Sequence, residues 1–174
     1  MGEQNRRHPN VVNVSELEAQ KQEKGKRFGS AFKWLGMATG AKGVGCSWYE
    51  VPPGRTAFPA HYHCANEEAI FVLEGEGTAR IGKDSVAIRA GDYITFPPGP
   101  DFAHQLVNSG TTPLRYLALS TMNAVEVVGY PDSGKIGAIA RVPGKAWSDK
   151  PWIRAVVPEN AAVDYYDGEK VDEP

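Results

Sequence analysis

Two histidines and two carboxylates lie within eight residues, in the segment HYHCANEE of residues 61–68. His61 and His63 are two positions apart, and alternate side chains of a β-strand point to the same face. On a strand, their Cα atoms would lie about 6.7 Å apart on one face. Their imidazole nitrogens could then converge on one metal ion, at about 2.0–2.1 Å each. The segment therefore predicts a metal site rather than a solvated polar turn.

A carboxylate close to this pair could supply a third ligand after a tight turn onto the next strand. Two adjacent acids compete for that place, Glu67 and Glu68, and neighbours on a strand point to opposite faces. The residues that follow, 69–73, place apolar side chains on both faces. Periodicity alone therefore leaves the choice between the two acids open.

A fourth ligand is expected further along the chain, which contains four histidines. His8 lies in a charged N-terminal segment and is expected to be solvated. His104 begins the strand-like segment HQLVN and follows the turn PPGPDFA. If the strands wind into a barrel, His104 can face His61 and His63.

The elements that would position these residues are short β segments of five to eight residues, separated by glycine, proline, aspartate and asparagine. Even spacing of this kind indicates an all-β sandwich or barrel over residues 31–121. Residues 1–30 are interpreted as a tail with one short helix, for which Ser15, Glu18 and Gly25 would be the N-cap, the capping-box acid and the C′ glycine. Residues 122–174 are expected to form an irregular extension packed on the barrel or on a second subunit. The predicted strands are AFKWLG, VGCSWYEV, AIFVLEG, GTARIG, SVAIRAG, YITFPPG, HQLVN and LRYLALS.

Composition limits the function classes. The chain has 174 residues, 41% of them hydrophobic, and a formal net charge of −2. One domain with a real core suits this length, and the absence of a basic excess argues against nucleic-acid or membrane-surface partners. No stretch approaches the ~20 apolar residues of a membrane span, and the charged N-terminal segment does not resemble a signal peptide. A cytoplasmic protein is expected, in which Cys46 and Cys64 are reduced.

The segment PPGRTAFPAHYHCANEEAIFVLEGEG, residues 52–77, resembles the first motif of the cupin superfamily. That motif is a glycine, a spacer, His-x-His, a glutamate and, after six residues, a second glycine. The last spacing selects Glu68, because Glu67 would put Glu74 where the glycine belongs. The matching positions are Gly54, His61, His63, Glu68 and Gly75.

The segment GDYITFPPGPDFAHQLVN, residues 91–108, resembles the second cupin motif, and its matching positions are Gly91, Pro97, Gly99, His104 and Asn108. Two spacers are longer than in the common pattern: six residues rather than five before His61, and four rather than two before His104. These differences look like loop variants. The two motifs in this order make the chain similar to small single-domain bacterial cupins.

The resemblance implies a double-stranded β-helix barrel with a divalent metal inside it, and a homodimer. The ligands that it implies are His61, His63, Glu68 and His104. Three imidazoles and one carboxylate suit Fe, Mn, Ni, Zn or Co, and the ligand types do not choose among them. Octahedral coordination would leave two positions for water, a substrate or O₂.

Two main hypotheses follow. The first is a metal-dependent enzyme of the oxygenase, isomerase, epimerase or lyase type, acting on a small polar metabolite. No catalytic acid or base is assigned, and an unliganded Glu67 is only a distant candidate. The second is a non-catalytic module that binds a metal or a small ligand. A third possibility is an interaction protein in which the barrel docks the N-terminal and C-terminal segments.

Overall fold

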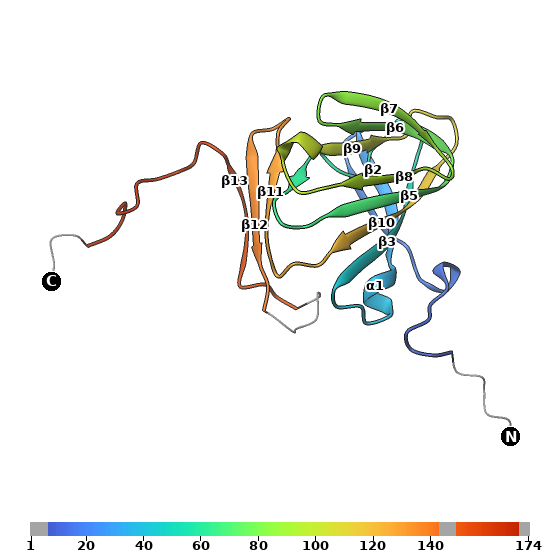
Figure 1. Cartoon of the computed structure of the whole chain (residues 1–174), viewed down its shortest axis with the longest axis horizontal. Helices are drawn as coiled ribbons and strands as arrows, with labels where there is room; N and C mark the ends of the chain where they lie inside the picture. Colours follow the sequence, from blue (N-terminus) through green and yellow to red (C-terminus); the bar gives the residue numbers. More distant parts are fainter. Residues whose placement is uncertain (1–6, 143–148, 171–174) are drawn as a thin grey trace, which may run out of the picture.

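The computed structural model describes residues 7–142 and 149–170, so Trp147 of the C-terminal extension lies outside the described residues. The chain folds into antiparallel sheets with little helix, and this architecture agrees with the double-stranded β-helix expected from the sequence (Figure 1). The confirmed fold class follows from the short apolar segments separated by turn residues. Within the described residues, no helix combines the length and apolar character needed to cross a membrane.

A six-stranded sheet forms one wall of the barrel. Its strands in spatial order are β1 (Gln20–Lys24), β2 (Phe28–Trp34), β3 (Val44–Val51), β10 (Leu114–Thr121), β5 (Glu68–Glu74) and β8 (Tyr93–Phe96). Strands β3, β10 and β5 lie at its centre, and β10 pairs with β3 over its whole length. Alternate residues of these strands, such as Val51, Val72 and Leu114, are fully buried.

The opposite wall is a three-stranded sheet in the order β7 (Asp84–Arg89), β6 (Glu76–Ile81) and β9 (His104–Val107). Gly75 joins β5 to β6 with φ 81°, and a Cβ there would lie 2.5 Å from the Pro113 carbonyl oxygen. Only glycine fits both constraints. The apolar core between the walls includes Tyr49, Val51, Ile70, Val72, Ala79, Ile88, Phe96, Leu106, Leu114 and Tyr116.

A four-stranded sheet packs beside the barrel, in the order β13 (Ile153–Pro158), β12 (Lys135–Ala140), β11 (Val125–Tyr130) and β4 (Tyr62–His63). The two-residue strand β4 joins this sheet through the pairs Val128–His63 and Gly129–Tyr62. The first cupin motif is therefore tied to the C-terminal part of the chain. The remaining elements are the short helix α1 (Leu35–Ala38) and the 3-10 turns η1 (Val14–Glu16) and η2 (Pro100–Phe102).

The chain differs from the sequence-based expectations at both ends. The N-terminal helix forms only as η1, which Asn13 and Glu16 cap reciprocally. Residues 20–24 instead pair with β2, and Gly25, with φ 59°, lies in the turn between these strands. Pairing with a neighbouring strand outweighs the weak helical preference of this segment. The C-terminal extension is also more regular than expected, because residues 125–140 and 153–158 form three strands.

Candidate metal centre

His61 and His104 are placed side by side by the backbone. They form an isolated antiparallel bridge. The His61 N–H donates to the His104 carbonyl at 3.1 Å, and the His104 N–H donates to the His61 carbonyl at 2.8 Å. The ring of Phe96 stacks on the His104 imidazole, with centroids 3.7 Å apart. These contacts hold two imidazoles from distant motifs on one wall of the barrel.

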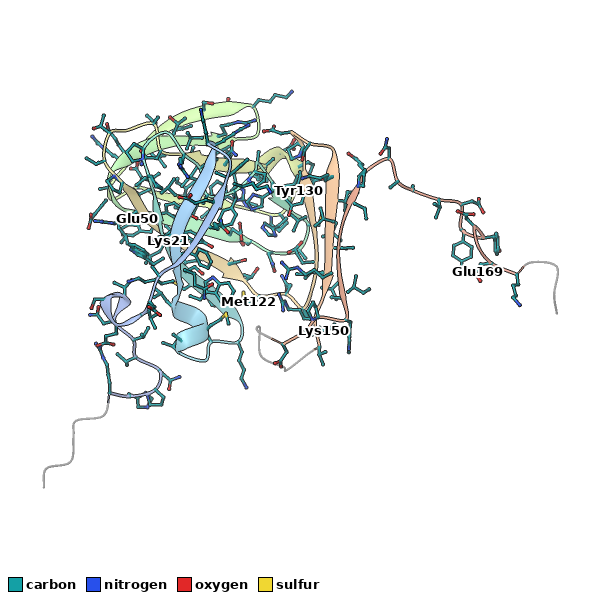
Figure 2. All side chains as sticks on the ribbon, turned by 180° about the vertical axis from the view of Figure 1, so that it is seen from behind. Lys21, Glu50, Met122, Tyr130, Lys150 and Glu169 are labelled. Carbon is teal, nitrogen blue, oxygen red and sulfur yellow. The ribbon has the colours of Figure 1, made fainter. Side chains whose placement is uncertain are left out.

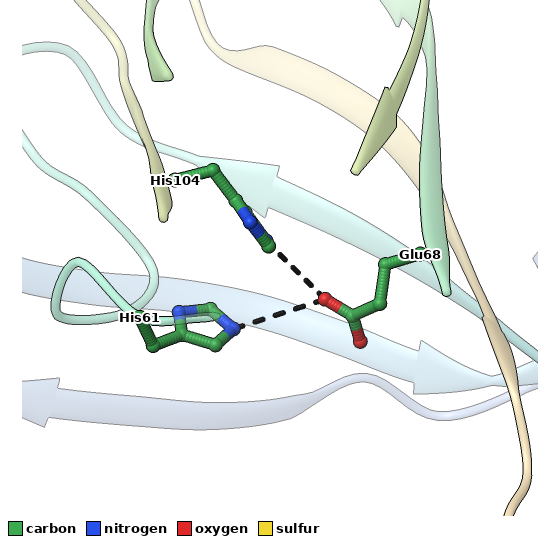
Figure 3. Close-up of side chains that lie close together, drawn as sticks. All are labelled: His61, Glu68 and His104. Atoms are coloured by element: carbon green, nitrogen blue, oxygen red, sulfur yellow. Dashed lines mark ion pairs between the residues drawn. The ribbon is translucent and has the colours of Figure 1, made fainter. Parts of the chain in front are cut away.

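Glu68 is the carboxylate that faces the histidines. Its Oε2 atom lies 3.2 Å from Nε2 of His104, 3.3 Å from Nε2 of His63 and 3.8 Å from Nε2 of His61. His61, Glu68 and His104 each offer a ligand atom within 4.8 Å of the others (Figure 3). Ligand atoms at about 2.0–2.2 Å from one ion and at right angles to each other would lie about 3 Å apart. The observed separations fit such a centre.

The hydrogen bonds of the imidazoles define which nitrogen faces the site. His61 Nδ1 lies 3.0 Å from the Pro59 carbonyl oxygen, and His104 Nδ1 lies 3.1 Å from the Phe102 carbonyl oxygen. A carbonyl oxygen only accepts, so each Nδ1 carries the proton that it donates. In the neutral rings, the Nε2 lone pairs of His61 and His104 therefore point toward the Glu68 carboxylate. Facing acceptors of this kind need either a proton on the ring nitrogen, which then donates to the carboxylate, or a metal cation between them.

A carboxylate from outside the two motifs lies beside His63. Its Nδ1 lies 3.4 Å from Oε2 of Glu126 on β11. Glu126 is 3% exposed, and its two oxygens accept four backbone N–H groups, from residues 64, 65, 66 and 127, at 2.7–3.1 Å. One buried side chain thus holds the loop after β4 and places a carboxylate oxygen beside the His63 ring, whose Nδ1 has no closer hydrogen-bond partner. Sequence reasoning missed Glu126, for which the only signal was one acid between valines in VEVV.

The charges of the site perturb its titrating groups. Burial by itself would raise the pKa of Glu68, but hydrogen bonds from His104, His61 and His63 hold this pKa far below its usual range. Burial lowers the pKa of His104 below the usual value for histidine, and this effect exceeds the opposing effect of Glu68. Burial also disfavours the charged form of His63, yet Glu68 and Glu126 outweigh it and raise the pKa of His63.

A cavity of about 390 Å³ adjoins these residues, and all four of the predicted ligands lie on its wall. Tyr49 belongs to this wall, where burial, together with the charge of Glu68, raises its pKa to about 12. Its phenol therefore stays neutral near pH 7. Most of the wall is apolar, and its large side chains include Trp34, Met37, Phe58, Tyr116, Met122 and Tyr130.

The predicted site residues can now be located. His61, Glu68 and His104 come together from two motifs about 40 residues apart. His63 lies outside this mutual group and joins it through Glu68, whose Oε2 is 3.3 Å from His63 Nε2. Glu67, the other candidate acid, is exposed, and its backbone N–H donates to the Thr121 hydroxyl at 2.9 Å. It takes no part in the cluster. His8 is also exposed, as expected.

The cupin domain family model matches residues 47–120 of the chain. The match contains both motifs and all four clustered residues, and the double-stranded β-helix agrees with it. The chain therefore carries a cupin-superfamily domain. Uncharacterized protein MJ1618 of Methanocaldococcus jannaschii is 35% identical over 81 residues, a match that covers 45% of this chain and 62% of that protein. This chain thus spans less than two thirds of that relative's length.

Solved structures extend the similarity beyond the matched domain. A protein from Acidithiobacillus ferrooxidans, named as a candidate sugar phosphate isomerase, superimposes with a TM-score of 0.74 and 25% sequence identity. The match covers 90% of this chain and 96% of that protein. A cupin-superfamily protein from Silicibacter pomeroyi, named a sugar phosphate isomerase, superimposes with a TM-score of 0.73 and 21% sequence identity. The match covers 90% of this chain and 98% of that protein. A predicted oxalate decarboxylase from Thermotoga maritima superimposes with a TM-score of 0.56 and 26% sequence identity. The match covers 65% of this chain and 99% of that protein.

Proposed function

We propose that the protein is a metal-dependent enzyme that acts on a small polar metabolite, with His61, His63, Glu68 and His104 as the metal ligands. The observation that carries the proposal is the convergence of the Nε2 atoms on one oxygen of Glu68. The lone pairs of His61 and His104 face that oxygen, and a divalent cation would satisfy all of these groups at once. Fe, Mn, Ni, Zn and Co all suit this donor set.

A bound divalent metal would supply Lewis acidity toward a carbonyl or hydroxyl group, or a binding position for O₂. The chain itself would contribute the surroundings. The apolar wall of the cavity would exclude water around the reacting atoms, which strengthens electrostatic interactions there. The neutral Tyr49 phenol would be available to donate a hydrogen bond to a ligand that also binds the metal. These features favour a small acid or a sugar-like molecule with two oxygen donors.

The relatives offer reaction classes to test. The names of two structural neighbours mention sugar phosphate isomerases, and the name of a third mentions an oxalate decarboxylase. Isomerisation and decarboxylation both use a metal that polarises an oxygen of the substrate. For this chain, an isomerase, an epimerase, a lyase or an oxygenase is therefore proposed, without a named substrate.

The test begins with elemental analysis of untagged protein, followed by turnover assays with hydroxy acids, oxalate, sugars and sugar phosphates. Stoichiometric metal and turnover that disappears on chelation are expected. Glu68→Ala should lose both metal and turnover. Glu67→Ala, which changes the adjacent exposed acid, is the matched control and should keep both. Turnover that survives replacement of all four ligands by alanine would refute the proposal.

The alternative is a non-catalytic cupin that binds a metal or a small ligand. The cavity next to the cluster is compatible with both functions, because it gives a ligand access to the metal in either case. A protein that binds metal and small acids in titrations but turns over none of the assayed compounds would favour this alternative.

Three further expectations remain predictions. The homodimer implied by the family resemblance is one, and a cytoplasmic location is another. The division into a barrel over residues 31–121 with flanking segments 1–30 and 122–174 is the third. Limited proteolysis would test this division: early cleavage near residues 30 and 121 would support it, whereas protection of residues 20–34 would place β1 and β2 with the barrel.

A further inference from the structure

The strands β11, β12 and β13 have one face that points away from the barrel. On β11, Glu126 contacts the loop after β4, and Val128 and Tyr130 lie on the cavity wall. The alternate residues of β11 must therefore lie on the opposite face. The strand registers align them with alternate residues of β12 and β13. This outer face consists of Val125, Val127, Gly129, Ile136, Ala138, Ala140, Ile153, Ala155 and Val157.

All nine residues of the outer face are uncharged and apolar, and several are widely exposed. Val125 is 64% exposed, Ile153 54%, Val157 45% and Val127 39%. Tyr62 covers part of the face, because its ring lies against Gly129. A contiguous apolar surface of this kind marks an interaction site in soluble proteins. Charged side chains would be expected at alternate positions if this face met only water.

Strand β13 is exposed beyond this face. It is the last strand of its sheet and is exposed along its whole length. Val156, which points to the other face, is 58% exposed, and Trp152, directly before the strand, is 68% exposed. Within the described residues β13 has a pairing partner only in β12, so the exposed apolar surface continues to the end of the sheet.

The segment that follows β13, residues 159–170, leaves the sheet and extends away from the rest of the molecule (Figure 1). Glu169, near its end, lies far from the other labelled residues (Figure 2). This C-terminal arm carries large side chains that are nearly free of contacts with the barrel. Tyr165 is 87% exposed, Val163 73% and Tyr166 63%.

We infer that a second copy of this chain covers the outer face of β11–β13 and receives the C-terminal arm. The face carries no charge, so two copies can meet across a twofold axis without like-charge repulsion. Each arm leaves the sheet directly after β13 and can extend over the other copy (Figure 1). The inference concerns assembly and holds whether or not the protein binds metal.

The available area agrees with such a dimer. Trp152, Tyr165 and Tyr166 are mostly exposed, and an aromatic side chain buries roughly 150–250 Å² when it is covered. Together with the nine residues of the outer face, they approach the roughly 800 Å² per partner of a standard stable interface. The apolar face would form the core of this interface and the arms its periphery.

The first test is sedimentation velocity of the full chain at about 1 to 100 µM. A dimer is expected. Val125→Asp and Val157→Asp should each weaken it by roughly tenfold or more, because each would bury an unpaired charge. Val86→Asp is the matched control, since Val86 is an exposed valine, 48% accessible, on β7. Replacing Tyr165 and Tyr166 together by aspartate should also weaken the dimer.

A monomer at the highest concentration would overturn the inference and would leave the face to a different partner. So would a dimer that Val125→Asp and Val157→Asp weaken no more than Val86→Asp does. Hydrogen exchange of the wild type adds a test that needs no variant. The backbone amides of β11–β13 should exchange more slowly at high than at low protein concentration, because a second copy packed on the outer face suppresses local opening of the sheet. Equal exchange at both concentrations would contradict the dimer.

Discussion

The two walls of the barrel, which enclose the candidate metal centre, and the C-terminal sheet β11–β13 are built from similar strands. They differ in whether another part of the chain covers the apolar face. In β3, β5 and β10, the apolar face is covered by the opposite wall and becomes the core. In β11–β13, an equally apolar face points away from the barrel. Alternation of residue types therefore identifies the two faces of a strand without telling which of them has a partner.

The two regions also depend on each other. The barrel contributes the four predicted ligands from the cupin motifs, whereas the C-terminal sheet contributes Glu126, whose carboxylate lies 3.4 Å from Nδ1 of His63. Glu126 lies on β11 between Val125 and Val127, which belong to the outer face. The same strand thus faces the metal centre on one side and the inferred partner on the other.

The largest expected effect is loss of a ligand within the barrel. Glu68→Ala should weaken binding of Zn(II) or Co(II) by more than roughly 100-fold, beyond the 10–100-fold typical of outer-shell partners. The reason is that, among the described residues, Glu68 is the carboxylate that faces all three imidazole Nε2 atoms, so it would be the anionic ligand of the metal. Isothermal titration against Glu67→Ala as control measures the change. Equal affinities of the two variants would show that the cluster is not the metal site.

The next effect tests whether the C-terminal sheet belongs to the site. Glu126→Ala should weaken metal binding by roughly 10–100-fold, because His63 loses the carboxylate beside Nδ1. It should also lower the free energy of unfolding of the metal-free protein, by about 1–3 kcal/mol or more, since buried N–H groups lose their acceptor. Glu126→Gln keeps an acceptor and should recover part of both losses.

Calorimetric titration and urea denaturation of Glu126→Ala separate these two roles. A large loss of stability with unchanged metal affinity would assign Glu126 to the loop alone. If both metal affinity and stability were unchanged, Glu126 would neither support the metal site nor stabilise the loop after β4.

A third effect is the pH dependence of metal binding. The pKa of His63 is raised, so the metal-free protein keeps this ring protonated to above about 6.5, the unperturbed value. Metal must then displace that proton, and affinity should rise with pH by up to about tenfold per unit until pH exceeds the His63 value. The pKa of His104 is lowered, so its proton competes with metal less than that of His63. A metal affinity that stays constant between pH 5.5 and 7.5 (a window around about 6.5) would contradict this.

The lowered pKa of Glu68 acts at lower pH. A depressed carboxyl pKa stabilises the folded state above its unfolded value, near 4.5, and this contribution is lost as pH falls toward the folded value. Above about pH 4.5, ionised Glu68 should therefore raise the melting temperature of the metal-free protein. Glu68→Gln should lower the melting temperature there and should have less effect at lower pH. Thermal melts of both proteins in chelator measure it.

The smallest expected effect links the two regions. Val127→Asp should produce a monomer, and the uncovered β11 should hold Glu126 less firmly. Metal affinity should then fall by less than about fivefold, close to 1 kcal/mol. Titration of the monomeric variant beside Val86→Asp provides the measurement. A monomer with the affinity of the wild type would mean that the outer face and the metal centre are independent.

Local patterns predicted much of the barrel. The segment 44–51 was expected as a strand and is β3, and segments such as 104–108 and 114–120 correspond closely to β9 and β10. His61, His63 and Glu68 were identified as a group because strand periodicity and motif spacing act over a few residues. Glu126 could not be identified in this way, because its partners in residues 64–66 are about 60 positions away in the chain.

The sequence by itself determined the β segments, the turns that separate them and the pair of motifs with their potential ligands, because each depends on residue types at short and regular spacing. Only the tertiary structure decided that His104 lies beside His61, that residues 20–24 extend a sheet, that the C-terminal segment forms strands, and that its apolar face points outward. These outcomes depend on pairing between strands far apart in the chain. Such pairing is selected by the total burial and hydrogen bonding of the whole fold rather than by any one segment.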